Sequence, residues 1–109
     1  MKTKLTVLSF ALLAGWGAHA QTADTSHPAT PEQVQAIADN LKSALDTAKV
    51  SDVRVAANGK VACGFVNARI FAMSLNKDGK PAFALGIGAD RRDAAVRAEC
   101  QKVGINLPQ

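Results

Sequence analysis

Val61-Ala62-Cys63-Gly64-Phe65-Val66-Asn67-Ala68-Arg69 is the segment on which we expect the rest of this 109-residue chain to pack. It is apolar, it contains one of the two cysteines, and it follows the clearest turn signal, Ala57-Asn58-Gly59. This composition indicates a strand pinned to a core. The segment includes no evident nucleophile, base or metal cage, so it predicts a fold and no chemistry.

The residues around the turn predict a hairpin. Apolar residues alternate with polar ones on both sides of it, at Val53 and Val55 before the turn and at Val61, Cys63 and Phe65 after it. A two-residue Asn-Gly loop would place the apolar residues of the two strands on opposite faces, whereas a three-residue loop with Gly59 in the left-handed conformation places all five on one face. We expect the three-residue loop.

Further strands follow the segment. The apolar run continues through residues 70–75 and is too long for one ordinary strand, so we expect a bend or bulge near residues 67–70. Gly64 marks either a bulge or the close approach of another backbone. A polar loop at residues 76–81, with Gly79 supplying a positive φ, leads into a last strand that contains Phe83, Leu85 and Ile87.

A helix is predicted before the strands. Thr30 is placed as its N-cap, Pro31 as its first residue and Gln33 as the partner of Thr30 in a capping box. An apolar stripe follows at helical spacing: Val34, Ile37, Ala38, Leu41, Ala44, Leu45 and Ala48. A membrane-surface helix is the alternative, but the mixed charge of the polar face and the alanine-rich apolar face favour packing on a core.

A second helix is predicted near the C-terminus. Asp90 is its expected N-cap, with Asp93 three residues later, and its buried side repeats at Val96, Cys100 and Val103. Gly104 is expected to end the helix at the C′ position, where Ile105 folds back on the last turn in a Schellman motif.

The elements together predict a single α+β domain over residues 30–109. We expect an N-terminal amphipathic helix, a three- to four-stranded antiparallel sheet and a C-terminal helix, with both helices on one face of the sheet and the other face more open.

The N-terminus predicts export. A short basic start, an apolar run from Leu5 to Gly17 and the small-residue site Ala18-His19-Ala20 are typical of a signal peptide at residues 1–20, cleaved after Ala20. A membrane anchor is the alternative, but the apolar run is shorter than the roughly 20 residues that span a bilayer. We therefore expect a periplasmic or secreted protein with a flexible leader at residues 21–29 and no transmembrane segment in the mature chain.

Charge argues against nucleic acid as a partner. Without Lys2 and Lys4, the 13 basic residues fall to 11 against 9 acidic ones, so the net charge of the mature chain is +2. Nucleic-acid binding usually requires a much stronger basic surface.

The two cysteines predict a disulfide between Cys63 and Cys100 that staples the C-terminal helix to the sheet. In the chain-entropy model such a bridge contributes about 4 kcal/mol. A redox pair and a metal site are the alternatives, but a redox pair usually has C-x-x-C spacing and a structural metal site needs four ligands. We expect no metal and no cofactor.

The pattern C-G-x-V-N-A-[KR] resembles that of a family of small uncharacterised exported bacterial proteins. Matching residues are Cys63, Gly64, Val66, Asn67, Ala68 and Arg69. The chain departs from the family at residues 70–73, where the family has a segment rich in Asn, Gly and Tyr. The resemblance implies an envelope location and a disulfide, and it brings no activity. A weaker likeness is to BON-type envelope domains, which also run from an amphipathic helix into a hairpin.

Function follows by elimination. The one histidine of the mature chain, His27, lies in the predicted leader, and Asp90 and Asp93 are better explained as helix-capping residues than as a catalytic pair. We therefore expect a non-catalytic module that binds an unknown envelope protein. The alternative is a small-ligand-binding domain with an apolar pocket between sheet and helices.

Four residues form a possible binding surface: Asn67 and Arg69 at the expected bend, and Arg91 and Arg92 on the second helix. Such a basic patch would suit an anionic partner. The plainer interpretation, which we favour, is an ordinary solvated surface whose charge is balanced by neighbouring acids.

Overall fold

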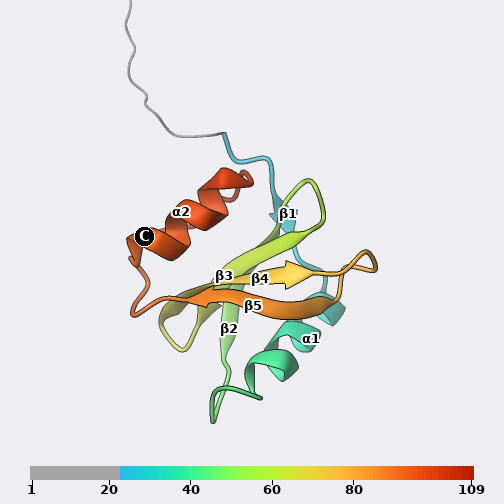
Figure 1. Ribbon diagram of the computed structural model, residues 1–109, viewed down its shortest axis with the longest axis vertical. Coiled ribbons are helices and arrows are strands. Elements are labelled where there is room, and N and C mark those ends of the chain that lie inside the picture. Colours follow the sequence, from blue (N-terminus) through green and yellow to red (C-terminus); the bar gives the residue numbers. More distant parts are fainter. Residues whose placement is uncertain (1–22) are drawn as a thin grey trace, which may run out of the picture.

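The computed structural model describes residues 23–109 (Figure 1). The predicted signal peptide and its cleavage position after Ala20 lie outside the described residues, as do residues 21 and 22 of the predicted leader.

Within residues 23–109 the chain forms an α+β domain, as predicted. Its elements are, in order, β1 (His27–Pro28), α1 (Pro31–Leu41), β2 (Val50–Val55), β3 (Val61–Val66), β4 (Arg69–Leu75), β5 (Pro81–Ile87) and α2 (Ala94–Lys102). The strands form one antiparallel sheet in the order β1-β2-β3-β4-β5, so each strand lies beside the next one along the chain. The prediction of three to four strands was too low, since the sheet has five.

The additional strand comes from the predicted leader. β1 pairs with the end of β2, and Ala29 N donates to Val53 O at 3.0 Å. Thr25 N donates to Gly104 O at 2.9 Å, and the side chain of Arg54 donates to Ser26. The domain therefore starts before residue 30, because these polar residues supply backbone hydrogen bonds to a sheet edge rather than side chains to a core.

The two helices lie on opposite faces of the sheet, so the prediction that they share one face was wrong. Two clusters of buried residues show this. The α1 cluster contains Ile37, Leu41, Val53, Val55, Ala62, Val66, Phe71, Met73 and Leu75. The α2 cluster contains Ala56, Cys63, Phe65, Ile70, Ala72, Val96, Cys100, Ile105 and Leu107.

Strand β3 contributes to both clusters. Successive side chains of a strand point to opposite faces, so Ala62 and Val66 pack under α1 while Cys63 and Phe65 pack under α2. Both faces of β3 are covered, and this explains why its sequence is continuously apolar rather than alternating.

The loop between β2 and β3 sets this arrangement. Val55 pairs with Ala62, and Ala56 N donates to Val61 O, which leaves residues 57–60 as a four-residue loop. An even number of loop residues puts the apolar residues of β2 on the face opposite Cys63. The predicted three-residue loop was therefore wrong, although Gly59 does have a left-handed φ of 73°.

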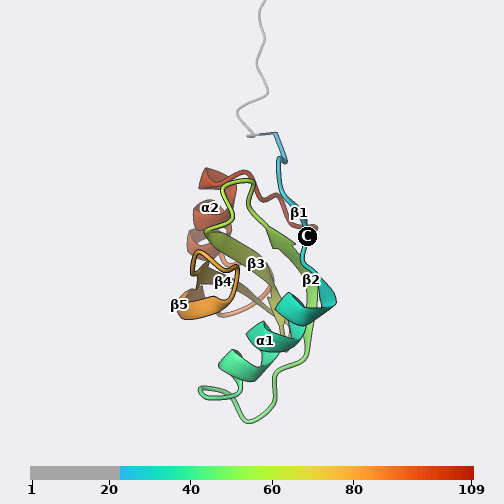
Figure 2. The same cartoon turned by 90° about the vertical axis from the view of Figure 1, so that its right-hand side faces the viewer.

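The sheet curls around α1. This helix contacts both β2 and β5, which are separated by two strands in the sheet, whereas α2 contacts β3 and β4 from the other side. Figures 1 and 2 show α1 between β2 and β5, with α2 on the far side of the central strands. α1 thus fills the inside of the curve and α2 covers part of the outside.

A tight hairpin, not the predicted bend within one strand, separates β3 from β4. Val66 pairs with Arg69, and the two residues between them, Asn67 and Ala68, have φ values of 50° and 65°. Positive φ at both central residues is the requirement of a type I′ turn, whose twist matches that of the flanking strands.

Gly64 marks the close approach of another backbone, which was one of the two predicted explanations. A Cβ at this position would lie 3.0 Å from Ser51 O and 3.1 Å from Val53 Cα. The neighbouring strand β2 shifts register between Ser51 and Arg54, and Asp52 there has a φ of 53°. The bulge is therefore in β2, opposite the glycine.

Helix α1 begins as predicted and ends early. The capping box is present, with Thr30 Oγ1 accepting from Gln33 N and Gln33 Oε1 accepting from Thr30 N. The helix stops at Leu41, and Ser43 Oγ then donates to Asn40 O, satisfying a carbonyl near the helix end. The predicted continuation to Ala48 was wrong, although Leu45 and Ala48 still pack against the α1 cluster.

Helix α2 begins three residues later than predicted and ends as predicted. Its N-cap is Asp93, whose Oδ1 accepts from Val96 N, while Asp90 forms a local turn by accepting from Arg92 N. At the other end, Gly104 N donates to Gln101 O and Ile105 N donates to Cys100 O. These two bonds make the predicted Schellman motif.

The predicted disulfide is confirmed. Cys63 in β3 is bonded to Cys100 in α2, with 6.2 Å between their Cα atoms, and both residues are fully buried. The bridge closes a sequence separation of 37 residues and links the sheet to the C-terminal helix.

Candidate functional site

The predicted binding surface is distributed around the β3–β4 turn and the segment that follows β5. Arg69 Nε donates to Gly88 O at 2.7 Å, which ties the start of β4 to the end of β5. Asp90 O accepts from Ile70 N at 3.1 Å and holds the same segment against β4. Arg69 is therefore engaged in joining two parts of the chain.

Asn67 is engaged in the same way. Its Oδ1 accepts from Lys49 N at 2.9 Å, its Nδ2 donates to Thr47 O, and its own N donates to Lys49 O at 3.0 Å. The amide thus connects the β3–β4 turn to the loop that follows α1. The oxygen and the nitrogen of this exposed amide are both bonded within the chain.

The two arginines before α2 differ from each other. The guanidinium carbon of Arg91 lies 3.7 Å from the centroid of the Phe65 ring, a cation–π contact that covers an edge of the α2 cluster. Arg92 is exposed, and its backbone N donates to Asp90 Oδ1. Of the four predicted surface residues, Arg92 is thus the one whose side chain extends freely into solvent.

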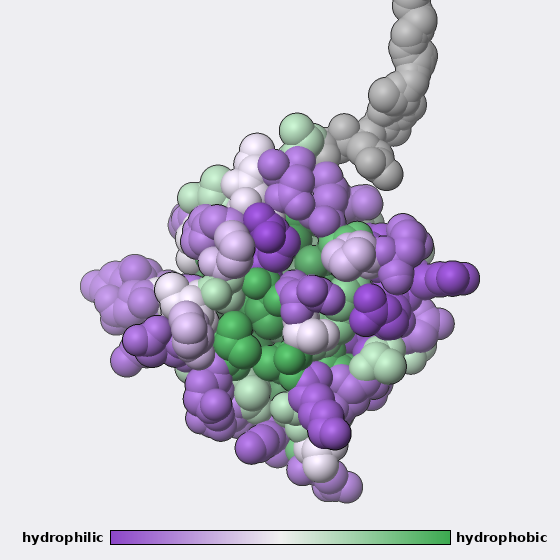
Figure 3. All heavy atoms as spheres, turned by 180° about the vertical axis from the view of Figure 1, so that it is seen from behind, coloured by the Kyte–Doolittle hydropathy of each residue, from purple (hydrophilic) through white to green (hydrophobic). Residues whose placement is uncertain are grey.

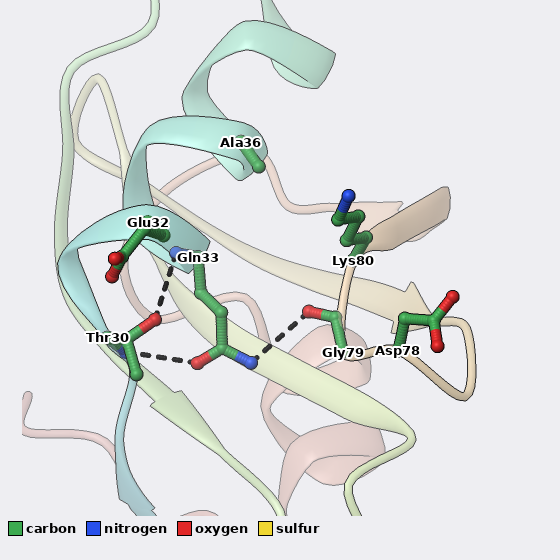
Figure 4. Close-up of a pocket in the computed structure, with 7 residues that line it drawn as sticks. All are labelled: Thr30, Glu32, Gln33, Ala36, Asp78, Gly79 and Lys80. Atoms are coloured by element: carbon green, nitrogen blue, oxygen red, sulfur yellow. Dashed lines mark hydrogen bonds between the residues drawn. The ribbon is translucent and has the colours of Figure 1, made fainter.

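A hollow of about 320 Å³ lies between the start of α1 and the β4–β5 turn (Figure 4). Gln33 lies across it, bonded to Thr30 at one side and donating to Gly79 O at 3.2 Å on the other. Its central polar groups therefore satisfy one another. The hollow is best explained as the place where Gln33 connects α1 to the β4–β5 turn.

A second hollow, of about 370 Å³, is bordered by Asp24, Arg54 and Asn106. Asp24 accepts from Ser26 N and from Asn106 N. The hydrogen bond from the Ser26 hydroxyl is the main reason that the pKa of this carboxyl lies below its ordinary value. These bonds tie the N-terminal segment to the C-terminal one.

Apolar atoms are visible on the side of the molecule that carries β1 and β2. Figure 3 shows them in the centre of this face, with polar residues around them. Within residues 23–109, however, the exposed large hydrophobic residues are Phe83 and Leu85, both in β5.

Strand β5 was predicted from the sequence, but its exposure was not. It is an edge strand, and the side chains of Phe83 and Leu85 are 58% and 48% exposed. Phe83 pairs with Ser74, which places it on the same face as Ala72 and the α2 cluster. Two irregularities interrupt the pairing of β5 with β4, on either side of Phe83 and Ala84.

A small apolar cavity adjoins these residues. It has a volume of about 150 Å³ and lies between β5 and α2, bordered by Ala72, Leu85, Gly86, Ala95, Val96 and Glu99. Phe83 and Leu85 therefore extend the outer face of the sheet beyond the part that α2 covers. The one sign of this site in the sequence is that no charged residue occurs from Pro81 to Ile87. The exposure of these residues cannot be read from the sequence, because it depends on the position of β5 at the edge of the sheet.

No family model, curated protein or solved structure matches the chain. The resemblance to the exported family and the weaker likeness to BON-type domains therefore stay predictions.

Within residues 23–109, neither helix has the length and apolar character needed to cross a membrane. In the same part of the chain, no three His, Cys, Asp or Glu residues are grouped so as to hold a metal ion.

Proposed function

We propose that this chain is a small exported, non-catalytic domain of the cell envelope that works by binding another polypeptide along β5. The observation that carries the proposal is the exposure of Phe83 and Leu85 on an uncharged edge strand. An edge strand presents unpaired backbone N–H and C=O groups, and exposed apolar side chains beside them favour the addition of a further strand.

The placement of the reactive side chains supports a binding role. Both cysteines are bridged and buried, and Asp93 and Thr30 serve as helix caps. His27 lies in β1, where its Nδ1 is 3.2 Å from Pro28 O. Each of these groups already has a structural partner.

The disulfide supports the export component, because such bridges persist in oxidising compartments. Mass spectrometry of the protein recovered from the cell envelope or the medium tests this component. We expect a mature N-terminus at Gln21. A chain that keeps Met1 and remains in the cytoplasm would contradict export.

Cross-linking in the cell tests the binding component. A photoreactive amino acid in place of Phe83 should yield a defined covalent adduct, and the same group in place of the exposed Ala44 after α1 should not. Adding Leu85→Ser to the Phe83 probe should abolish the adduct. An adduct that forms equally from both positions, or none from Phe83, would argue against β5 as the binding edge.

A small apolar ligand is the second candidate, favoured by the cavity between β5 and α2. Its volume of about 150 Å³ is below the range of roughly 300–1,000 Å³ usual for ligand pockets. Native mass spectrometry of the purified protein should show a bound small molecule if this candidate is correct.

A further inference from the structure

We propose that the polypeptide bound along β5 is a second copy of this chain, and that two β5 strands pair antiparallel to join two sheets into one. The proposal rests on the proposed function, because it names the partner of the same edge. A twofold symmetric interface must be complementary to itself, and the sequence and faces of β5 meet that condition.

The first requirement is that self-pairing buries no charge. Natural edge strands are commonly protected by charged residues, by proline or by bulges, and β5 has Pro81 at its start and two irregularities in its pairing with β4. What β5 lacks is a charge, which would be desolvated on pairing. The seven residues from Pro81 to Ile87 include no charged side chain. Two copies can therefore approach along β5 without removing a charge from water or opposing like charges.

The second requirement is that the side chains fit. With a twofold axis at Ala84, antiparallel pairing places Phe83 of one copy beside Leu85 of the other, and this pairing occurs twice. Phe83 lies on the α2 face through its pairing with Ser74, and Leu85 borders the cavity under α2. The four side chains would form one apolar cluster between the two α2 helices, covering residues that are about half exposed in one copy.

The third requirement concerns the ends of the strands. Lys77, Asp78 and Lys80 precede β5, and Asp90, Arg91, Arg92 and Asp93 follow it. Antiparallel pairing brings the start of one strand near the end of the other, so each end gathers residues of both signs whose charges sum to only +1. With a net charge of +2 per mature copy, long-range repulsion is weak.

Sedimentation equilibrium tests the proposal, with the chain purified in its oxidised form as it accumulates in the expressing cell. We expect a reversible change from the mass of one copy to that of two with rising concentration. Leu85→Lys and Phe83→Lys should each raise the dissociation constant roughly tenfold or more, because each places a charge in the apolar cluster. Ala44→Lys, at an exposed site after α1, should leave it unchanged.

Thermal unfolding of each variant separates loss of pairing from loss of folding, since an exposed lysine should leave the monomer folded. A wild-type chain that stays monomeric up to about 1 mM would overturn the proposal. So would a dimer whose dissociation constant is the same in both β5 variants and in the Ala44→Lys control.

A symmetric cross-link tests the register. A residue on a twofold axis faces its own copy, so Ala84→Cys should give a disulfide-linked dimer under mild oxidation while Ala44→Cys should not. Ala84 is exposed, and the native cysteines are both bridged. A dimer in solution without any cross-link through position 84 would contradict this pairing.

The cellular cross-link distinguishes this inference from the proposed function. An adduct of Phe83 with twice the mass of the chain agrees with the dimer. A monomeric chain whose Phe83 probe captures a different protein would sink the dimer and leave β5 as a binding edge. A monomeric chain without any adduct would sink both.

Discussion

Ala68 has a backbone conformation that favours glycine. It is exposed at the second central position of the β3–β4 turn, with a φ of 65°. A residue with a Cβ costs about 1–2 kcal/mol in this left-handed conformation, and glycine avoids that cost. Part of the gain in stability is lost, because glycine has more conformational entropy in the unfolded chain.

Ala68→Gly should therefore raise the free energy of unfolding by about 0.5–1 kcal/mol. Chemical denaturation measures it, with Ala57→Gly as the control. Ala57 is also exposed in a turn but does not have a positive φ, so glycine there should destabilise the domain. A loss of stability in Ala68→Gly would contradict the assignment of a strained turn.

Asp93 links the start of α2 to the preceding loop through its carboxylate. It accepts hydrogen bonds from Ala89 N and Val96 N, and these bonds lower its pKa from the ordinary value of 3.8. A carboxyl whose pKa is lower in the folded state stabilises the fold above the unfolded pKa, and this contribution is lost as the pH falls through the folded pKa.

Asp93→Asn should consequently flatten the loss of stability at low pH. Asparagine still caps the helix but does not titrate, so the midpoint of denaturation should fall less than in the wild type as the pH drops below about 4. Denaturation at a series of pH values measures the difference. Identical pH profiles would show that these hydrogen bonds contribute nothing to acid sensitivity.

At the level of elements, local signals in the sequence were reliable where a backbone motif depends on one or two side chains. The capping box of α1, the Schellman motif of α2 and the left-handed Gly59 follow from residues within a single turn. The number of loop residues between β2 and β3 does not, because two- to four-residue loops all accommodate an Asn-Gly pair. The number of residues in this loop determines which face of the sheet carries Val53 and Val55.

The end of α1 was also beyond local signals. The apolar stripe continues to Ala48, and it predicts burial correctly for Leu45 and Ala48 although the helix stops at Leu41. Both residues reach the core from a loop instead. A periodic pattern reports which side chains are buried, and the tertiary structure decides the conformation that buries them.

The bridge between β3 and α2 is the link between elements that can be tested most directly. Cys63→Ala/Cys100→Ala should lower the free energy of unfolding by about 2–5 kcal/mol, because the wild-type unfolded chain is restricted by a closed loop. Reductant should destabilise the wild type and leave the double variant unaffected. Two free thiols in the denatured, non-reduced wild type would show that the bridge is absent from the protein in solution.

At the level of the molecule, the position of β5 explains why the candidate site was not predicted. Phe83 and Leu85 have the alternation of a half-buried strand, and nothing local separates a strand that a helix covers from one at an exposed edge. The predicted polar residues are in the opposite situation, because the fold gives their side chains partners within the chain. Asn67 and Arg69 have donors suited to a partner, but the fold uses them to join the α1–β2 loop and the segment after β5 to the central hairpin.

The two clusters on opposite faces predict an order of local unfolding. Strands β2, β3 and β4 all contribute to the α1 cluster, so the sheet and α1 should open together. Helix α2 is short, and within it Val96 and Cys100 are the buried residues. Apart from the disulfide, two contacts hold α2. These are the packing of its buried residues and the C-terminal segment, in which Leu107 O accepts from Arg97 of α2 at 2.8 Å.

In Cys63→Ala/Cys100→Ala, the amides of α2 should therefore exchange with solvent much faster than those of β3 and α1. Regions with few buried contacts open at a lower free energy than the global unfolding, and removal of the bridge leaves α2 as such a region. Hydrogen exchange followed by mass spectrometry measures this, and in the oxidised wild type the protection of α2 should be closer to that of β3. Equal loss of protection in α1 and α2 would mean that the domain opens as one unit, and that the outer helix is held by its packing and not by the bridge.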